Sequence, residues 1–530
     1  MKRRFFLQAA TANGSAAPAG GAGAAAPFAD TGFAWLEAGA AELSRAMAEG
    51  RASAVALVQA YTGRIAAIDA AGPRLASVLE VNPDAAAIAA QLDAERAAGR
   101  LRGPLHGIPV VVKDNIATAD RMATSAGSPA LLGIVPPRDA AVVARLRAAG
   151  AVVLAKTNLS EWANFRGKNS VSGWSTRGGQ TRNPYALDRS PSGSSSGTGS
   201  AVAASLAALG VGTETDGSIT SPAGVAGLVG VKPTVGLVSR AGIVPIAFSQ
   251  DTAGPMCRSV ADAALLLAVL AGPDPGDPAT RAQAGKLAPE SLLRLPAGAL
   301  RGARLGVAGN LVEGHGRGTV ALFEAALAAL QAAGATLVRA PLPNLDKMGA
   351  GELEVLLFEI RQAMAAYLAD YAGAGPHRTL ADLVAYNQAH PQTLALFGQE
   401  WFEQAVAKGP LDMPAYRRAL ATGRRLSRTH GIDAMLRQHR LDAIIAPTGG
   451  PAWLIDPVNG DAGSAPSATM PAAVAGYPHV TVPMGQVAGL PVGLSFFGGA
   501  WQDARLLALA LHYEQTTRHR APPTYRPTST

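Results

Sequence analysis

Cysteine is nearly absent from this chain of 530 residues, which contains only Cys257. A single cysteine excludes an intramolecular disulfide and any metal site built from paired cysteines. No histidine stands beside it in DTAGPMCRSV to activate the thiol, so we expect Cys257 to be a small core residue. The sequence therefore indicates no metal site and no cofactor.

Long apolar segments and clusters of basic residues are also missing. No run of about eighteen strongly apolar residues occurs, so we expect no transmembrane helix and no stable membrane anchor. The formal net charge of +8 raises the question of a nucleic-acid partner. The Lys and Arg residues are scattered singly, without a run of five, so the favoured interpretation is a solvated basic surface and no nucleic-acid partner.

The N-terminus has the pattern of a targeting signal. In MKRRFFLQAA, Arg3 and Arg4 precede two phenylalanines and a leucine, and an Ala/Gly-rich run continues to Ala29. This resembles a twin-arginine export signal, which predicts that residues 1–29 are a signal and that the mature protein is periplasmic or secreted. The alternative is a low-complexity N-terminus without a targeting function.

From residue 30 onward, helical and extended patterns alternate. Residues 41–50 and 52–72 carry apolar side chains at helical spacing. Extended apolar runs at 106–115 and 150–162 are separated by the helical pattern AAVVARLRAAG, which is the rhythm of a β-α-β unit. Residues 201–210, AVAASLAALG, resemble a buried helix.

The second half of the chain differs in pattern. Residues from about 310 to 440 are mainly helical, and extended runs return in LDAIIAPT, HVTVPMG and PVGLSFFGG. We therefore predict an α/β fold over residues 30–530: a single large domain with a central mixed β-sheet covered by helices and a mainly helical insertion at about 310–440.

Residues 192–200, SGSSSGTGS, are a candidate binding or catalytic loop. A phosphate-binding loop is excluded because no Lys follows Gly197. The pattern G-x-S-x-G matches the nucleophile elbow of an α/β-hydrolase esterase, with Ser195 as the nucleophile. That elbow must follow a buried strand, and the preceding TRNPYALDRSP is polar and contains Pro184 and Pro191. The elbow remains an alternative that the pattern disfavours.

A second loop of small and hydroxyl-bearing residues follows in GVGTETDGSITSPAG. Together, Lys113 in HGIPVVVKDNI, Ser194 in SGSSSGTGS and Ser218 twenty-four positions later resemble the amidase signature family. Further matches are AKTNLSEWA, GGQTRNPY, GLVGVKPTVGLVSRAGIVPI, SQDTAGPM, IIAPT and GLPVGLSFFG. The resemblance covers roughly residues 35–520 and is weakest from 310 to 440.

The resemblance implies a serine amidase with a Ser-cisSer-Lys triad. Ser218 is the implied nucleophile, Ser194 the proton relay after a cis peptide bond, and Lys113 the base. The chemistry is reasonable, because burial disfavours a charged lysine and brings its pKa toward a range where it accepts a proton. The backbone N–H groups of Thr215, Asp216, Gly217 and Ser218 are the implied oxyanion hole.

Two positions depart from the commonest family pattern, Gly-Gly-Ser-Ile-Arg. Asp216 replaces the first glycine and Thr220 replaces the arginine, which argues against a tRNA-dependent amidotransferase component. With FEIRQAMAAYLADY, these residues resemble bacterial peptide amidase-like enzymes, which remove ammonia from C-terminal peptide amides. The expected partner is thus a small-molecule or peptide amide.

Some assignments stay open. The alternatives are a noncatalytic or amidotransferase-type subunit of a tRNA-linked complex and an esterase that uses Ser195. The substrate-binding residues are unknown, although residues 310–440 are the expected pocket wall. Lys156, Glu161 and Asp251 are expected to be ion-pair scaffolding rather than substrate contacts.

Overall fold

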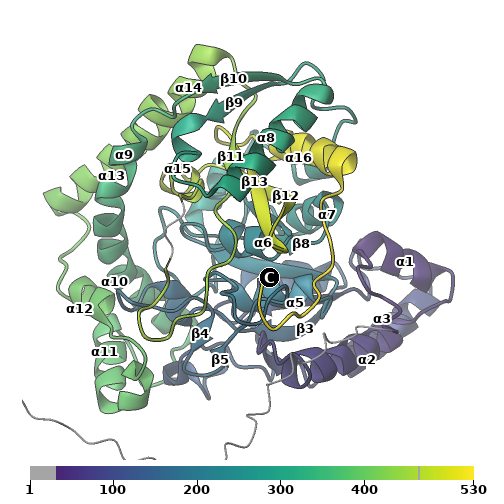
Figure 1. Ribbon diagram of the computed structural model, residues 1–530. Coiled ribbons are helices and arrows are strands. Elements are labelled where there is room, and N and C mark those ends of the chain that lie inside the picture. Colours follow the sequence, from purple (N-terminus) through teal and green to yellow (C-terminus); the bar gives the residue numbers. More distant parts are fainter. Residues whose placement is uncertain (1–31, 463–465, 530) are drawn as a thin grey trace, which may run out of the picture.

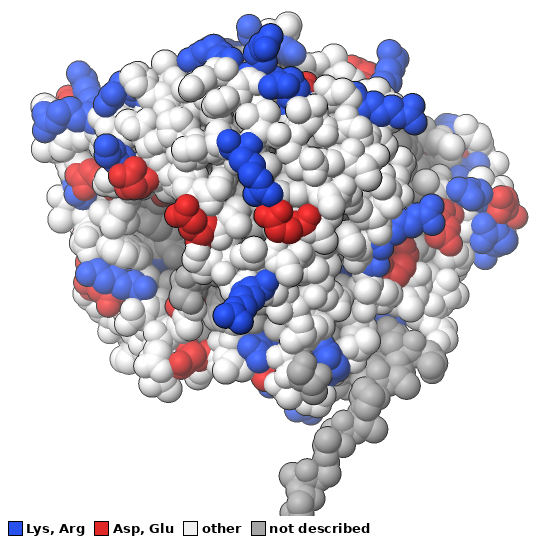
Figure 2. Space-filling model, turned by 45° about the horizontal axis from the view of Figure 1, so that its top comes forward, with Lys and Arg blue, Asp and Glu red and all other residues white. Residues whose placement is uncertain are grey.

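The computed structural model describes residues 32–462 and 466–529. The predicted export signal, residues 1–29, lies outside these described residues. Within them, no helix is both long and apolar enough to cross a membrane. On the face shown in Figure 2, several Lys and Arg side chains gather at the top edge, and others are scattered with acidic side chains among them.

One large mixed sheet organises the described chain (Figure 1). Its eleven strands within the described residues have the order β1-β3-β2-β6-β8-β7-β12-β13-β11-β9-β10. The strands are β1 (Val78–Val81), β2 (Pro109–Lys113), β3 (Val152–Thr157), β6 (Leu209–Glu214), β7 (Val229–Lys232), β8 (Thr252–Cys257), β9 (Arg304–Ala308), β10 (Thr336–Ala340), β11 (Ala443–Pro447), β12 (His479–Val487) and β13 (Leu490–Phe497). Two short strands, β4 (Trp174–Ser175) and β5 (Gly179–Gln180), form a separate hairpin.

Helices flank this sheet. They are α1 (Ala40–Ala48), α2 (Ala54–Arg64), α3 (Ala85–Ala97), α4 (Ala141–Ala148), α5 (Ser196–Ala203), α6 (Thr220–Val225), α7 (Val260–Leu270), α8 (Arg317–Ala332), α9 (Leu345–Met348), α10 (Glu352–Tyr371), α11 (Leu380–Ala389), α12 (Glu400–Val406), α13 (Pro414–Ser427), α14 (Asp433–His439), α15 (Thr469–Ala475) and α16 (Asp503–Thr517). Helix α4 contacts α7, α7 contacts α16, and α16 contacts α8. Helices α5 and α6 contact each other and the sheet, and form a second group. In Figure 1, α10 to α13 lie along one side of the molecule and α1 to α3 along another.

The predicted fold class is confirmed. Strands β2 and β3 are parallel with α4 between them in sequence, as the β-α-β pattern predicted. All five residues of β2, PVVVK, are buried, which suits a central strand of branched apolar side chains. The three extended runs near the C-terminus form β11, β12 and β13.

One helix was placed wrongly from the sequence. Residues 201–210 were expected to be helical, but α5 starts at Ser196 inside the serine-glycine stretch, and Leu209 already begins β6. The glycines permit close packing: a Cβ on Gly197 would lie 2.3 Å from the carbonyl oxygen of Ser77. Tertiary contact therefore overrides the weak helix propensity of glycine and serine.

The segment 310–440 contains α8 to α14 and one strand. That strand, β10, pairs in parallel with β9 at the edge of the sheet. Helix α10 carries residues that line the largest cavity described below. The segment thus contributes to the sheet as well as to helices beside it.

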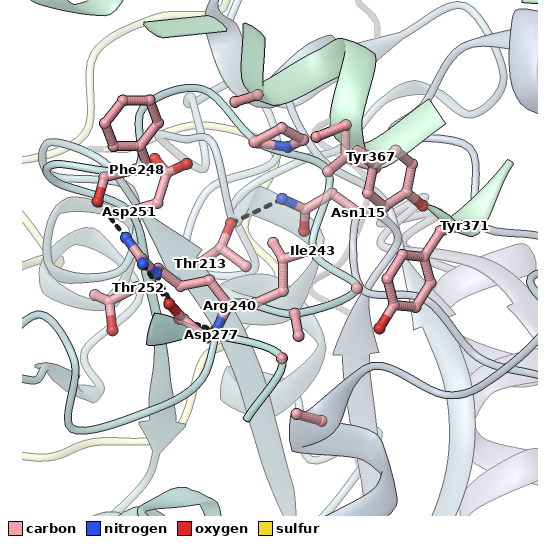
Figure 3. A pocket seen from close by; sticks show the side chains of 18 of the residues that line it. Asn115, Thr213, Arg240, Ile243, Phe248, Asp251, Thr252, Asp277, Tyr367 and Tyr371 are labelled. Atoms are coloured by element: carbon pink, nitrogen blue, oxygen red, sulfur yellow. Dashed lines mark hydrogen bonds and ion pairs between the residues drawn. The ribbon is translucent and has the colours of Figure 1, made fainter. Parts of the chain in front are cut away.

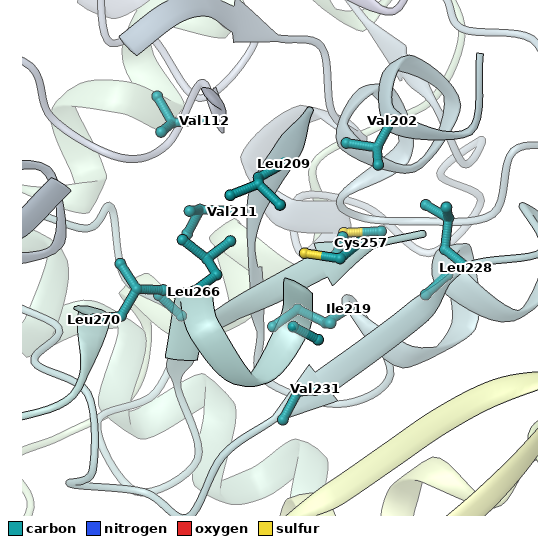
Figure 4. Close-up of a cluster of buried hydrophobic side chains, with 14 of the residues drawn as sticks. Val112, Val202, Leu209, Val211, Ile219, Leu228, Val231, Cys257, Leu266 and Leu270 are labelled. Carbon is teal, nitrogen blue, oxygen red and sulfur yellow. The ribbon is translucent and has the colours of Figure 1, made fainter. Parts of the chain in front are cut away.

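The apolar core lies where β2, β6 and β7 meet the helices. Figure 4 shows Val112, Val211, Val231 and Leu266 in this cluster, together with Cys257. Cys257 is fully buried, which confirms the prediction of a small core residue, and burial raises the pKa of its thiol. This rigid layer supports the strand ends from which the candidate site is built.

Candidate active site

Neighbouring strand ends bring the predicted site residues together. Strands β2 and β6 are parallel neighbours, with Val112 opposite Val211. Because parallel strands end at the same edge of a sheet, Lys113 at the end of β2 lies beside the end of β6 and the loop that carries Ser218. The loop before α5 places Ser194 at the same edge.

Lys113 is fully buried at this edge. Its Nζ lies 2.7 Å from Ser194 Oγ, 2.9 Å from Thr213 Oγ1 and 3.3 Å from the Thr213 carbonyl oxygen. A neutral amine can donate to both oxygens of Thr213 and still accept a proton from Ser194. Burial lowers the pKa of Lys113 to about 7, and the negative charges of Glu214 and Asp251 partly oppose this effect.

Two residues that the sequence did not single out hold this lysine. Thr213 contacts Lys113 through both of its oxygens, and Asn115 Nδ2 donates a hydrogen bond to Thr213 Oγ1 at 3.0 Å. Asn115 stands two residues after Lys113 in KDN, and Thr213 stands five residues before Ser218. Their position near Lys113 and Ser218 in the sequence was the only feature that could have identified them beforehand.

Ser194 occupies the middle position. It is fully buried, and the peptide bond between Gly193 and Ser194 is cis, which confirms the prediction. The Ser160 backbone N–H donates to the Ser194 carbonyl oxygen at 3.1 Å. A Cβ on Gly193 would lie 2.2 Å from Ser160 Oγ, so this position requires glycine.

Ser218 is the most accessible of the three residues, with 8% of its surface exposed while Ser194 and Lys113 have none. Its carbonyl oxygen accepts a hydrogen bond from Ser195 N at 3.1 Å, which joins the two serine loops. The hydrogen bonds of the described residues include none between the Ser194 and Ser218 side chains. Ser218 is therefore the less deeply buried of the two serines.

Glu214 anchors the loop that carries Ser218. Its buried carboxylate accepts hydrogen bonds from the backbone N–H groups of Ile219 and Thr220, at 2.8 Å and 2.9 Å. The Thr220 hydroxyl donates to the same carboxylate at 3.1 Å. Thr220, one of the two departures noted above, thus binds the anchor of this loop.

The four predicted oxyanion donors form the turn between β6 and α6. Among the described residues, none of the backbone N–H groups of Thr215, Asp216, Gly217 and Ser218 has a hydrogen-bond acceptor. Gly217 has a φ of 75°, which favours glycine in this turn. The turn can therefore direct free N–H groups toward a ligand, and its role in catalysis stays a prediction.

The side chains of Gln250 and Asp251 also hold this turn through hydrogen bonds to Thr215. Thr215 Oγ1 donates to Asp251 at 2.6 Å, and Gln250 Nε2 donates to the Thr215 carbonyl oxygen and to Glu352. Burial and the nearby Glu352 carboxyl raise the pKa of Asp216 well above its usual range. The side chain that replaces the usual glycine thus has a carboxyl group whose neutral form is favoured by burial and by Glu352.

The structure does not support Ser195 as an elbow nucleophile. No strand precedes it in residues 190–194, and its side chain is fully buried. Ser195 Oγ donates to the Thr213 carbonyl oxygen at 3.0 Å and accepts from Thr213 N at 3.2 Å. This hydroxyl helps to hold β6 in place.

The three charged residues expected to be scaffolding are all buried. Glu161 forms an ion pair with Arg166. Lys156 instead donates to the Ile116 carbonyl oxygen and to Thr124 Oγ1, and Asp251 accepts from Thr215 and two backbone N–H groups. Within the described residues, Lys156 and Asp251 thus support the fold through hydrogen bonds with neutral partners rather than ion pairs.

Two cavities lie near the three residues. The larger, of about 470 Å³, includes Asn115 and Thr213 in its wall and is drawn in Figure 3. The other, of about 410 Å³, is lined by Ser221, Thr448, Trp453 and Ser467. Ser221 lies one helical turn after Ser218, and its hydroxyl is 2.8 Å from that of Ser192. Residues 448–451, 453, 462, 466 and 467 thus lie in the wall of a cavity near the nucleophile candidate.

Comparison with known proteins gives consistent matches over most of the chain. The profile of the family described as Amidase matches residues 56–507. The structure resembles that of native peptide amidase from Stenotrophomonas maltophilia, with 53% identity, a TM-score of 0.89, and coverage of 93% of this chain and 100% of that one.

More distant relatives also match. An amidase family protein from Bacillus anthracis has 34% identity and a TM-score of 0.83, with 92% of each chain covered. A glutamyl-tRNA(Gln) amidotransferase chain of Symbiobacterium thermophilum is 38% identical over 91% of this chain and 97% of its own length. These similarities extend well beyond the loops that carry the three candidate residues.

Proposed function

The chain belongs to the Amidase family and is a serine amidase that hydrolyses a carboxamide C–N bond; we propose that its substrates are C-terminal amides of peptides and that Ser218, Ser194 and Lys113 carry out the reaction. The contact of 2.7 Å between Lys113 Nζ and Ser194 Oγ, buried beneath the accessible Ser218, is the observation that carries this assignment.

Acylation follows from this arrangement. Ser218 Oγ attacks the amide carbon, its proton passes to Ser194, and the Ser194 proton passes to neutral Lys113. The resulting negative oxygen is stabilised by the free N–H groups of residues 215–218; one such donor is typically worth about 3 kcal/mol. Lys113 then returns its proton through Ser194 to the leaving nitrogen, the C–N bond breaks, and an ester on Ser218 remains.

Deacylation uses the same groups. Water attacks the ester carbon and loses a proton through Ser194 to Lys113. The carbon–oxygen bond to Ser218 breaks, and Ser218 regains a proton by the reverse path. The products are a carboxylic acid and ammonia or an amine, and the enzyme returns to its starting state.

The similarity to peptide amidase supports the choice of substrate. The test is ammonia release from a peptide amide, from the same peptide as a free acid, and from short aliphatic amides of equal concentration. We expect the peptide amide to be preferred in kcat/KM and its internal peptide bonds to survive, as mass spectrometry can show. Equal or faster turnover of the aliphatic amides, or internal cleavage, would contradict the proposal.

The similarity to the glutamyl-tRNA(Gln) amidotransferase chain supports a second candidate, a subunit of a tRNA-linked complex. The departures at Asp216 and Thr220 argue against it. Purified protein that hydrolyses peptide amides without any partner would exclude this candidate, whereas activity on glutamine only with added partner proteins would favour it.

We also propose that the protein is exported and that residues 1–29 are removed. The support is the arginine pair followed by apolar residues in MKRRFFLQAA. N-terminal sequencing of active protein from its native host should find a start between about residues 22 and 35, given usual signal lengths. An intact Met1 on most of the active protein would reject export.

A further inference from the structure

The cavity of about 470 Å³ beside Asn115 and Thr213 has a lining rich in charged side chains. Its inner wall includes Asn115 and Thr213, which hold Lys113. At its outer side lie Arg138 and Asp370, whose side chains are 57% and 68% exposed. The cavity thus extends from solvent to Thr213, which contacts Lys113.

Negative groups outnumber positive groups in its lining. The acidic side chains are Asp139, Glu214, Asp251, Asp274, Asp277 and Asp370, and the basic ones are Arg138 and Arg240. Arg240 is engaged by Asp277, with contacts of 2.7 Å and 2.5 Å, and also donates to the Phe248 carbonyl oxygen. The Arg138 guanidinium lies over the Tyr371 ring, 4.3 Å from its centroid.

The other pairs leave a surplus of carboxylates. Arg138 lies 4.0 Å from Asp370, and Arg147, outside the cavity lining, lies 2.9 Å from Asp139. In residues 32–462 and 466–529, Glu214, Asp251 and Asp274 have no lysine or arginine partner within 4 Å; they accept hydrogen bonds from neutral groups. The cavity therefore favours a positively charged ligand.

A buried hydrogen-bond acceptor in the cavity wall also favours a ligand that carries N–H groups. Asn115 is only 2% exposed, and its Nδ2 donates to Thr213, while its Oδ1 has no hydrogen-bond partner among the described residues. Figure 3 shows this amide within the cavity, next to Ile243 and Tyr367. A buried oxygen without a donor is costly, so a ligand with N–H groups would satisfy it.

The remaining wall suits a short hydrocarbon chain. Tyr367 and Tyr371 are stacked with ring centroids 5.6 Å apart, and Ile243 and Phe248 complete the apolar part of the lining. These rings can bury methylene groups of a ligand, while the Arg138 guanidinium already lies over Tyr371. From the carboxylate surplus, the unsatisfied Asn115 oxygen and these rings, we propose that the cavity is a binding site for a small primary alkylammonium ion.

Calorimetric titration of the full chain tests this site without substrate, so the result is independent of the proposed reaction. The ligands are hexylammonium, hexan-1-ol and hexanoate, which share a chain length and differ in charge, near pH 7.5 where a primary amine is protonated. We expect binding of hexylammonium alone. Equal binding of the alcohol, preferential binding of hexanoate, or no binding of hexylammonium would overturn the proposal.

Matched variants locate the ligand. Ala363 lines the cavity on α10, so Ala363→Leu should fill it and weaken hexylammonium binding at least about tenfold, whereas Ala369→Leu, on the same helix but outside the lining, should not. Asp274→Asn should weaken binding, and Glu290→Gln, which removes a charge outside the lining, should not. Unchanged affinity in both Ala363→Leu and Asp274→Asn would overturn the site.

Discussion

The two serine loops have similar compositions but opposite environments. The loop with Ser194 is closed: its serine is fully buried, and its hydroxyl contacts Lys113. The loop with Ser218 is the more open of the two: its serine is 8% exposed, and the backbone N–H groups of residues 215–218 have no acceptors among the described residues. Depth below the surface, rather than composition, therefore separates a proton relay from a nucleophile.

The same comparison explains how the two loops remain in register. Ser195 N donates to the Ser218 carbonyl oxygen, while Ser195 Oγ bonds to Thr213 on β6. Glu214 then binds the first residues of α6 behind Ser218. A neutral serine and a buried carboxylate thus position the reactive serines without being reactive themselves.

The strongest test of the open loop is Ser218→Ala. Removal of the attacking hydroxyl should reduce kcat by about 10⁴-fold or more and abolish labelling by a fluorophosphonate. Rates on a peptide amide and gel fluorescence of the labelled protein measure both effects. Labelling that survives in Ser218→Ala but disappears in Ser195→Ala would reverse the two roles.

The next test is Lys113→Arg, which changes the residue that contacts Ser194 of the closed loop. Arginine keeps a positive charge but does not give up its proton near neutral pH, so kcat should fall about 10³-fold, close to the effect of Lys113→Ala. Thermal unfolding of both variants shows whether they are folded. Substantial activity in Lys113→Arg would show that the lysine is a structural cation.

The link between the loops can be tested through pH. Because burial lowers the pKa of Lys113 to about 7, the wild-type rate should rise as pH increases through this range and the amine becomes neutral. Glu214 raises that pKa, so Glu214→Gln should move the acid limb of the kcat profile to lower pH, while the amide oxygen can still accept from Ile219 N. Glu290→Gln is the matched control, and a limb that does not move in Glu214→Gln would contradict this coupling.

The smallest expected effect is that of Ser195→Ala. Among the described residues, its hydroxyl bonds only to the backbone of Thr213, so a stability loss of about 1 kcal/mol and a decrease in kcat of less than about tenfold are expected. Denaturant unfolding and steady-state kinetics measure the two quantities. A decrease equal to that of Ser218→Ala would mean that the closed loop contains more than a relay.

Much of this arrangement could be predicted from local patterns. The run PVVVK predicted a buried strand with a lysine at its end, and the cis bond before Ser194 followed from family resemblance. The helix expected at 201–210 was wrong, because the contact of Gly197 with Ser77 and Asn158 is invisible to local propensity. Thr213 and Asn115 were missed because isolated polar residues carry no periodic signal.

The sequence by itself determined the α/β class, the amidase family and the three candidate residues, since these depend on motifs whose residues lie close together along the chain. Only the tertiary structure decided that Asn115 and Thr213 hold Lys113, that Glu214 anchors the Ser218 loop, and that a cavity rich in carboxylates reaches Thr213 beside this lysine. The physical reason is that burial and hydrogen bonding depend on distances between segments far apart in sequence, and the pairing of β2 with β6 creates those distances.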